Sequence, residues 1–146
     1  MPMARYVKLL KLPAETTIKG LRPLQKKDLH EAYELLDKYL ERFPIHFEFS
    51  EAEFEHFFLN RPGVCDSYVV QDPTDKKITD FISFYTLPSS ILRHDKHKLL
   101  KVAYSFYNVP GKYSLTDLMK DALVLAKNAD FDVFNALDIM DNEEFL

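Results

Sequence analysis

The chain has 146 residues, a length typical of one domain, and 47% of them are hydrophobic, enough to form a core. The formal net charge is −4 at pH 7 and no long run of Lys or Arg occurs, so the composition does not indicate a nucleic-acid partner. The single cysteine cannot form an internal disulfide, which fits a cytoplasmic location. No apolar stretch approaches the ~20 residues of a transmembrane helix.

The N-terminal 27 residues are expected to form a strand and a connector. Residues 5–11 are predicted to be extended, and Gly20 to form a turn. A helix is predicted over 28–42, because its apolar residues recur at spacings of three and four. Asp28 is a suitable N-cap for this helix, and Pro44 a natural stop.

A second, short helix is predicted from Ser50 to about Phe58. Ser50 and Glu53 have the spacing of a capping box, in which each side chain accepts a hydrogen bond from a free N–H group of the first turn. A strand is expected at 67–71, and the polar turn at 72–75 leads into the next strand, which predicts a hairpin.

The strongest strand signals lie between residues 77 and 108. Residues 78–87 are apolar on both alternating faces, which is typical of a central strand covered on both sides. A second strand is predicted at 101–108. The polar connection at 88–100 is long for a hairpin loop, and long ordered loops are often functional.

A third helix is predicted over 115–128 and a last strand over 131–137. Antiparallel strands that are followed by a helix and one more strand favour an α+β fold, with a mixed, mostly antiparallel sheet flanked by helices.

Most residue types that could carry chemistry have a structural explanation. His94 and His97 lie close together but lack a third ligand, so they are interpreted as solvated loop residues and no metal site is expected. Cys65 has no partner base and is interpreted as a structural cysteine. No residue is therefore assigned a catalytic role.

Three polar residues stand out because they lie in or at the end of apolar strands: Ser89, Tyr104 and Asn135. Buried polar groups need hydrogen-bond partners. A peptide or a small polar ligand could be that partner, but interior water or neighbouring backbone could serve equally well.

Three blocks of the sequence resemble N-myristoyltransferases, the glycylpeptide N-tetradecanoyltransferases of eukaryotes. These blocks are KITDFISFYTLPSSI at 77–91, KVAYSFYNV at 101–109 and DALVLAKNADFDVFNAL at 121–137. The order of elements also resembles the acyl-CoA N-acyltransferase (GNAT) superfamily. The resemblance implies that residues 1–146 form one GNAT-like domain, the peptide-acceptor half of the family enzyme without its closing segment.

The resemblance implies an acyltransferase function. Myristate would pass from myristoyl-CoA to the N-terminal glycine of an acceptor protein, with this chain supplying most of the peptide-binding half. A separate N-terminal half would bind myristoyl-CoA and stabilise the transition state with backbone N–H groups. This chain is expected to bind no cofactor itself, since myristoyl-CoA is the co-substrate of the full enzyme, and to be inactive alone.

The resemblance also assigns the three polar residues. Ser89 matches the serine that hydrogen-bonds the acceptor peptide, Tyr104 matches a tyrosine lining the same groove, and Asn135 matches an asparagine close to the peptide in some members. An alternative is a non-catalytic GNAT-like module that binds peptides with an N-terminal glycine. A GNAT-like domain with its own small-molecule donor is disfavoured, because residues 108–118 lack a Gly-rich pyrophosphate loop.

Overall fold

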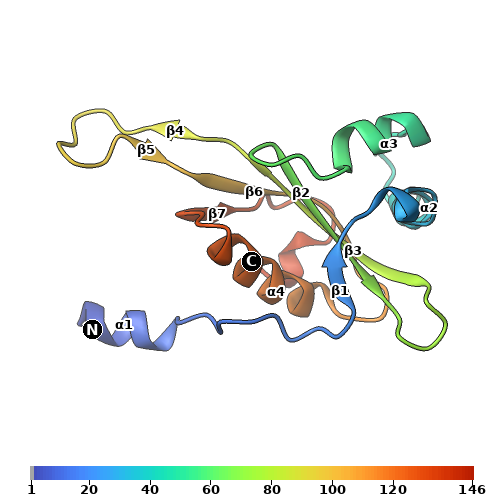
Figure 1. The fold of residues 1–146 in the computed structure, drawn as a ribbon, viewed down its shortest axis with the longest axis horizontal. Helices are drawn as coiled ribbons and strands as arrows, with labels where there is room; N and C mark the ends of the chain where they lie inside the picture. Colours follow the sequence, from blue (N-terminus) through green and yellow to red (C-terminus); the bar gives the residue numbers. More distant parts are fainter. Residues whose placement is uncertain (1) are drawn as a thin grey trace.

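In the computed structural model, which describes residues 2–146, helices cover both faces of a five-stranded sheet (Figure 1). The strand order is β1-β2-β3-β6-β7; all neighbours are antiparallel except β6 and β7, which are parallel. The strands of this sheet are β1 (Leu21–Pro23), β2 (Cys65–Gln71), β3 (Ile78–Thr86), β6 (Val102–Val109) and β7 (Val133–Asn135). The expected α+β class with a mixed, mostly antiparallel sheet is confirmed.

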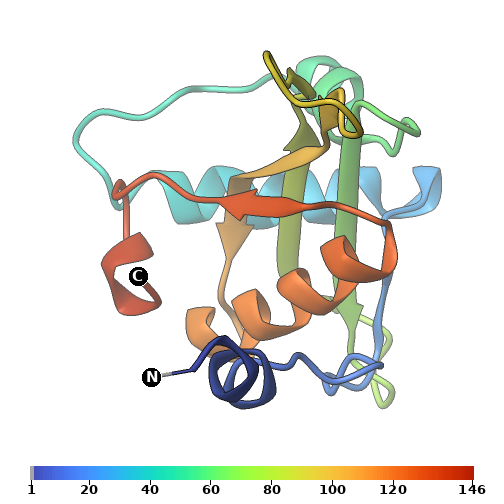
Figure 2. The ribbon, with the colours of Figure 1, turned by 90° about the vertical axis from the view of Figure 1, so that its left-hand side faces the viewer.

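The α-helices are α1 (Met3–Leu9), α2 (Leu29–Leu40), α3 (Glu51–Phe58) and α4 (Leu115–Asn128), with short 3-10 turns η1 (Lys26–Asp28) and η2 (Asn142–Glu144). Helix α4 lies in front of the strands and α2 behind them in Figure 2, so the two helices cover opposite faces of the sheet. Among the described residues, no helix combines the length and apolar character needed to cross a bilayer.

The central strand β3 contributes side chains to a hydrophobic core on each face of the sheet. Phe81 is fully buried in an aromatic cluster with Phe54 and Phe58 of α3. Its neighbour Ile82 is fully buried on the opposite face, against Leu118 of α4. Each such side chain contributes about 2 kcal/mol by leaving water. The prediction of a central strand covered on both faces is confirmed.

Local signals fix the starts of two helices. The Ser50 hydroxyl accepts a hydrogen bond from the Glu53 N–H, and the Glu53 carboxylate accepts one from the Ser50 N–H. Ser114 caps α4 in the same way, by accepting from the Asp117 N–H at 3.1 Å. Asp28 differs, because its carboxylate accepts from the Gln25 N–H of η1 instead of capping α2.

The N-terminal segment differs from the prediction. Residues 5–11 were expected to be extended, but Met3–Leu9 is a helix with no buried residue. An extended segment needs a strand partner, and the first strand that pairs is β1, beyond Gly20. Gly20 has a φ of 85°, and a Cβ there would lie 2.2 Å from the Gln71 carbonyl oxygen, so this turn requires glycine.

The connection at 88–100 is a second correction, because it continues the hairpin of β3 and β6. Ser89–Ser90 (β4) pairs with Leu99–Leu100 (β5), and the Leu87 N–H donates to the Val102 carbonyl between the two ladders. The resulting arm, residues 87–101, projects from the sheet toward the side of the molecule that carries α1 (Figure 1). The last strand is also shorter than the predicted 131–137.

Candidate functional site

Two of the three predicted site residues lie side by side at one end of the sheet. Tyr104 of β6 is paired with Asn135 of β7 and, on its other side, with Tyr85 of β3. Paired residues point to the same face of a sheet, so the three side chains share one face. The rings of Tyr85 and Tyr104 stack at 5.4 Å with an interplanar angle of 11°.

Ser89 belongs to the same ladder but lies farther out. Four residues separate Tyr85 from Ser89 on one strand and Leu100 from Tyr104 on the other, so the register continues into the arm without a shift. Strand alternation then predicts that Ser89 points to the face that carries Tyr85 and Tyr104. The sequence treated residue 89 as a strand exit; the structure makes it part of a paired strand.

The three side chains are accessible and unpaired. Ser89 and Asn135 are exposed, and Tyr104 is half-buried. Within residues 2–146 none of their side-chain oxygens or nitrogens makes a hydrogen bond. They therefore present two hydroxyls and one amide that can each donate and accept a hydrogen bond from a ligand.

A hollow of about 330 Å³ adjoins the stacked tyrosines. Tyr85 and Phe106 line it together with Phe57, Arg61, Val64 and Cys65. The Tyr85 and Phe106 rings contact each other edge to face at 5.4 Å, which gives this side of the sheet an aromatic floor. Ser89, Tyr104 and Asn135 do not themselves line this hollow.

Cys65 has the character of a structural residue. Its side chain is 3% exposed, and its Sγ lies 3.6 Å from the Ser67 hydroxyl. Burial raises the pKa of the thiol, which keeps it protonated at neutral pH. A protonated, buried thiol is a poor nucleophile, in agreement with the sequence interpretation.

A larger apolar hollow, of about 680 Å³, was not anticipated from the sequence. It lies between the end of α2 and the segment before η2, and it is lined by Leu40, Phe43, Pro44, Ile45, His46, Phe47, Tyr107, Ile139 and Met140. Asp141 holds the second wall to α2, because its carboxylate accepts from the Tyr39 hydroxyl at 2.9 Å and pairs with Arg42 at 3.1 Å. The apolar residues that follow α2 in the sequence were the signal from which this hollow could have been predicted.

The histidine pair lies at the tip of the arm. The rings of His94 and His97 are 4.9 Å apart, and His94 Nδ1 accepts hydrogen bonds from the backbone N–H groups of Lys96 and His97. His94 therefore serves the turn. No group of three or more His, Cys, Asp or Glu side chains suited to a metal ion occurs within residues 2–146.

The geometry thus offers a surface suited to recognition. The aromatic floor, Tyr104 and Asn135 share one face of the sheet, and strand alternation predicts that Ser89 continues this face on the arm. Such a surface suits an extended polar chain that can hydrogen-bond along it.

Comparison with known proteins identifies the family of this chain. The family model described as "Myristoyl-CoA:protein N-myristoyltransferase, C-terminal domain" matches residues 1–146. "Glycylpeptide N-tetradecanoyltransferase 2" of Bos taurus is 47% identical over 146 residues, which is 100% of this chain and 29% of the relative. "Glycylpeptide N-tetradecanoyltransferase 1" of Arabidopsis thaliana is also 47% identical, over 100% of this chain and 34% of its own length.

Solved structures agree with the sequence comparison. A crystal structure of Saccharomyces cerevisiae N-myristoyltransferase with bound myristoyl-CoA superimposes with a TM-score of 0.92 at 38% identity, over 99% of this chain and 38% of that one. A Bacillus halodurans protein at 15% identity and a TM-score of 0.63 shares the fold alone.

The chain spans about a third of the length of these relatives. The match nevertheless runs through every element of the fold, because all 146 residues align with the family model. The expected GNAT-like fold is confirmed by the yeast structure. This chain belongs to the N-myristoyltransferase family and corresponds to its C-terminal domain.

Proposed function

We propose that this chain supplies most of the peptide-binding half of an enzyme that transfers myristate from myristoyl-CoA to the N-terminal glycine of acceptor proteins. The observation that carries the proposal is the family match over all 146 residues. The relatives named above are glycylpeptide N-tetradecanoyltransferases, and a yeast relative binds myristoyl-CoA. The half that binds myristoyl-CoA would be a second polypeptide segment, and myristoyl-CoA would be a co-substrate.

The unpaired polar face supports a role in holding the acceptor. An extended peptide exposes N–H and C=O groups along its length, and the free hydroxyls of Ser89 and Tyr104 can donate to or accept from them. The Asn135 amide can do the same from the neighbouring strand. The Tyr85 ring keeps the Tyr104 ring in place by stacking at 5.4 Å. These residues would position the acceptor and would not react with it.

The reaction itself needs groups that this surface does not present. The glycine amine attacks the thioester carbonyl, a C–N bond forms, the C–S bond breaks and the CoA thiol leaves. The ammonium form of the amine must first give up a proton to a base. Negative charge on the carbonyl oxygen needs N–H donors, which we assign to the second half. This chain alone is therefore expected to be inactive.

Reconstitution tests the proposal. The 146-residue chain would be mixed with the segments of the Bos taurus relative that lie outside the matched region, and a peptide beginning with glycine would be offered with myristoyl-CoA. We expect the mixture to form myristoylated peptide, and each component alone to form none. A peptide that begins with alanine is the matched control and should not react.

Two results would contradict the proposal. Turnover by the 146-residue chain alone would place the chemistry within it. Failure of a stable mixed complex to transfer myristate to any glycine-initiated peptide would remove the assigned activity.

A further inference from the structure

Arg61 is a cation without an anionic partner, just beyond the end of α3. It is exposed, it lies on the edge of the 330 Å³ hollow, and it makes no salt bridge within residues 2–146. Its Nη2 donates a hydrogen bond to the His56 carbonyl, which leaves most of its guanidinium N–H donors free. An unpaired guanidinium of this kind can hold a carboxylate through two parallel hydrogen bonds.

The hollow beside Arg61 has apolar walls. Tyr85 and Phe106 form its floor, and the side chain of Val64, which is 49% exposed, lies at its edge. No acidic residue lines it. A bound side chain with methylene groups and a terminal charge could place the methylenes on the rings and the charge beside the guanidinium.

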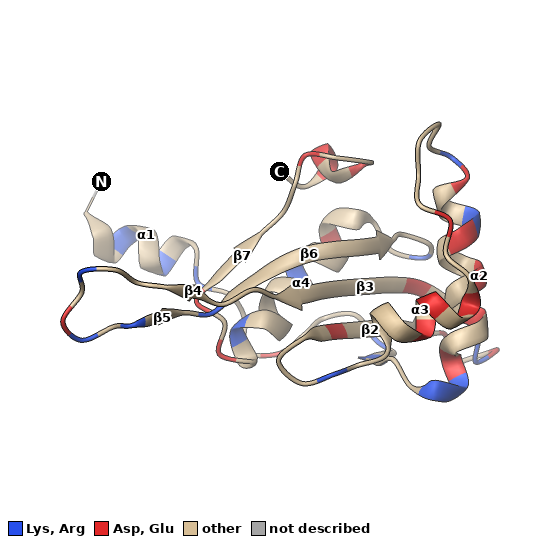
Figure 3. Cartoon of the chain, turned by 90° about the horizontal axis from the view of Figure 1, so that it is seen from above, with Lys and Arg blue, Asp and Glu red and all other residues tan. Residues whose placement is uncertain are grey.

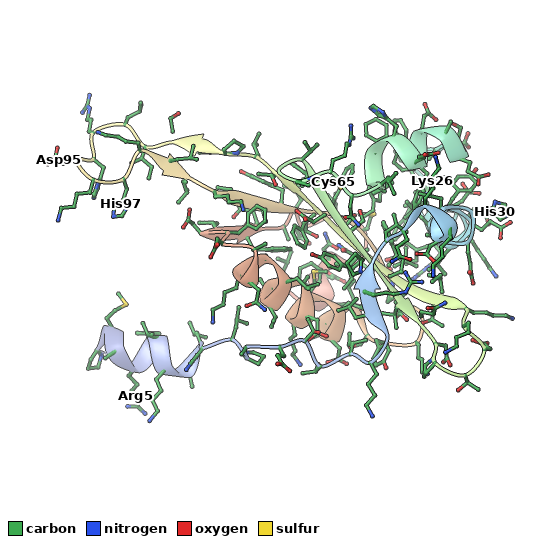
Figure 4. All side chains as sticks on the ribbon, in the orientation of Figure 1. Arg5, Lys26, His30, Cys65, Asp95 and His97 are labelled. Carbon is green, nitrogen blue, oxygen red and sulfur yellow. The ribbon has the colours of Figure 1, made fainter. Side chains whose placement is uncertain are left out.

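The charge of Arg61 acts on the floor of the hollow. Burial raises the pKa of the Cys65 thiol, and the positive charge of Arg61 opposes this rise. Cys65 itself lines the hollow, and it lies between α3 and the tip of the arm, which Asp95 and His97 mark in Figure 4. The guanidinium is therefore close enough to the floor to interact with a group that binds there.

The surrounding charges favour an anionic occupant at this place. Acidic residues gather on α2 and α3, whereas the arm carries Lys and Arg (Figure 3). Glu51 and Glu53 belong to the first turn of α3, at the end away from Arg61, and Glu55 pairs with Lys26 at 3.4 Å. Residues 91–101 of the arm carry four Lys or Arg and one Asp. A carboxylate between the arm and the end of α3 would therefore be attracted from both sides.

The hollow continues the face that is proposed for the acceptor. Tyr85 stacks on Tyr104 and also lines the hollow, where its ring contacts Phe106. Ser89 lies four residues from Tyr85 in the direction of the arm, which is about 13 Å along an extended strand. A peptide that runs along this ladder from Ser89 would therefore reach the hollow after about four residues.

We propose that the hollow is a specificity subsite of the acceptor groove that takes an acidic side chain. The methylene groups of that side chain would lie on the rings of Tyr85 and Phe106, and its carboxylate would pair with Arg61. The inference rests on the proposed function, because the acidic residue belongs to the glycine-initiated acceptor. Arg61 would select among acceptors and would take no part in acyl transfer.

A scan of the acceptor sequence tests this subsite. Glycine-initiated peptides would carry a single glutamate or a single lysine at successive positions in a serine background, and calorimetry would measure their binding to the 146-residue chain without CoA. At the position that reaches the hollow, we expect glutamate to bind about fivefold more tightly than lysine. This preference should shrink at high salt, because the Arg61 side chain is exposed.

A charge reversal identifies the cause of the preference. Arg61→Glu should make lysine bind more tightly than glutamate at the same position. Lys38→Glu makes the same charge change at an exposed position of α2 and should leave the preference unchanged. Circular dichroism should show the same fold for both variants, because both side chains are exposed and the backbone hydrogen bonds between residues 61 and 65 remain.

A steric variant tests the hollow independently of charge. Val64→Trp places a large ring at the exposed edge of the hollow. We expect it to remove the preference for glutamate and to change the affinity for the peptide without glutamate or lysine by less than about twofold. A preference that survives Val64→Trp would place the acidic residue outside the hollow.

The same preference in the original chain and in the chain with Arg61→Glu would overturn the inference. An equal change caused by Lys38→Glu, or the absence of binding by every glycine-initiated peptide, would also overturn it. A preference that reverses with Arg61→Glu, in a chain whose reconstituted mixture transfers no myristate, would refute the proposed function alone. Acyl transfer without a preference for glutamate at any position would refute the subsite alone.

Discussion

The two ends of the central hairpin use polar residues in opposite ways. Near the start of β3, Asp80 is fully buried, and its carboxylate accepts hydrogen bonds from the backbone N–H groups of Gly111, Lys112 and Tyr113. At the other end, Tyr104 and Ser89 have hydroxyls without any partner within residues 2–146. The first end is complete in itself, whereas the second is available to a ligand.

This difference separates structural from recognition roles better than residue type does. A buried carboxylate with all its bonds made stabilises the fold and has no remaining capacity for a ligand. Asp121 of α4 belongs to the same class, because it accepts from the Thr17 and Ile18 N–H groups and is 1% exposed. Exposed, unpaired groups on a rigid sheet cost the fold little and can be replaced without unfolding it.

The largest expected effect on stability is at the Asp80 end of the hairpin. Asp80→Ala removes the acceptor for three backbone N–H groups and for the Thr79 hydroxyl at 2.6 Å. Because these partly buried donors would be left without their acceptor, we expect a loss of about 3 kcal/mol or more in the free energy of unfolding. Urea unfolding followed by circular dichroism measures it. Asp75→Ala, at an exposed turn, should cost less than about 1 kcal/mol; equal losses would contradict the assignment.

Asp121→Asn should have an intermediate effect. The amide keeps one acceptor oxygen but loses the charge and one of the two oxygens that hold the N–H groups of Thr17 and Ile18 at 2.9 and 2.8 Å. We expect a loss of about 1–2 kcal/mol in the same urea measurement. Asp130→Asn is the matched control, since Asp130 is exposed and lies just beyond α4. A control that loses as much as the test variant would show that the contact is not the cause.

Substitutions at the end of the hairpin that carries Tyr104 and Ser89 should change binding and leave the fold intact. Tyr104→Phe keeps the ring that stacks on Tyr85 but removes the hydroxyl, and Ser89→Ala removes the other hydroxyl. Each should lower affinity for a glycine-initiated peptide about three- to tenfold, measured by calorimetry without CoA. Tyr113→Phe removes a hydroxyl from the opposite end of the sheet and should have no effect. Unchanged affinity in both test variants would remove these residues from the site.

The smallest effect concerns a surface ion pair at the Asp80 end of the hairpin. Lys112 Nζ lies 2.6 Å from the Asp72 carboxylate, and this hydrogen bond is the largest cause that lowers the pKa of Asp72 to about 2. A carboxyl pKa that is lower in the folded state stabilises the fold above the unfolded value of about 4, and this contribution disappears as the pH falls from about 4 toward 2. Lys112→Ala should raise the Asp72 pKa toward about 4, as measured by NMR titration. An unchanged value would identify the other contacts of Asp72 as the cause.

Much of the fold follows from local sequence signals. The capping serines Ser50 and Ser114 fix the starts of α3 and α4, because a hydroxyl followed three residues later by an acidic residue satisfies free N–H groups within one turn. The apolar residues on both alternating faces of 78–86 also identified the central strand from neighbouring residues in the sequence alone. The family resemblance was also contained in the sequence, and the match over 1–146 confirms it.

Long-range pairing decided what the sequence left open or predicted wrongly. Residues 3–9 became a helix because no strand offered them a ladder, and the connection at 88–100 became a paired arm because its two sides continue the register of β3 and β6. The stacking of Tyr104 on Tyr85 and its pairing with Asn135 depend on strands 19 and 31 residues apart in the sequence. Periodicity reports which face a residue occupies but not which strand lies beside it, and only the tertiary structure supplies that neighbour.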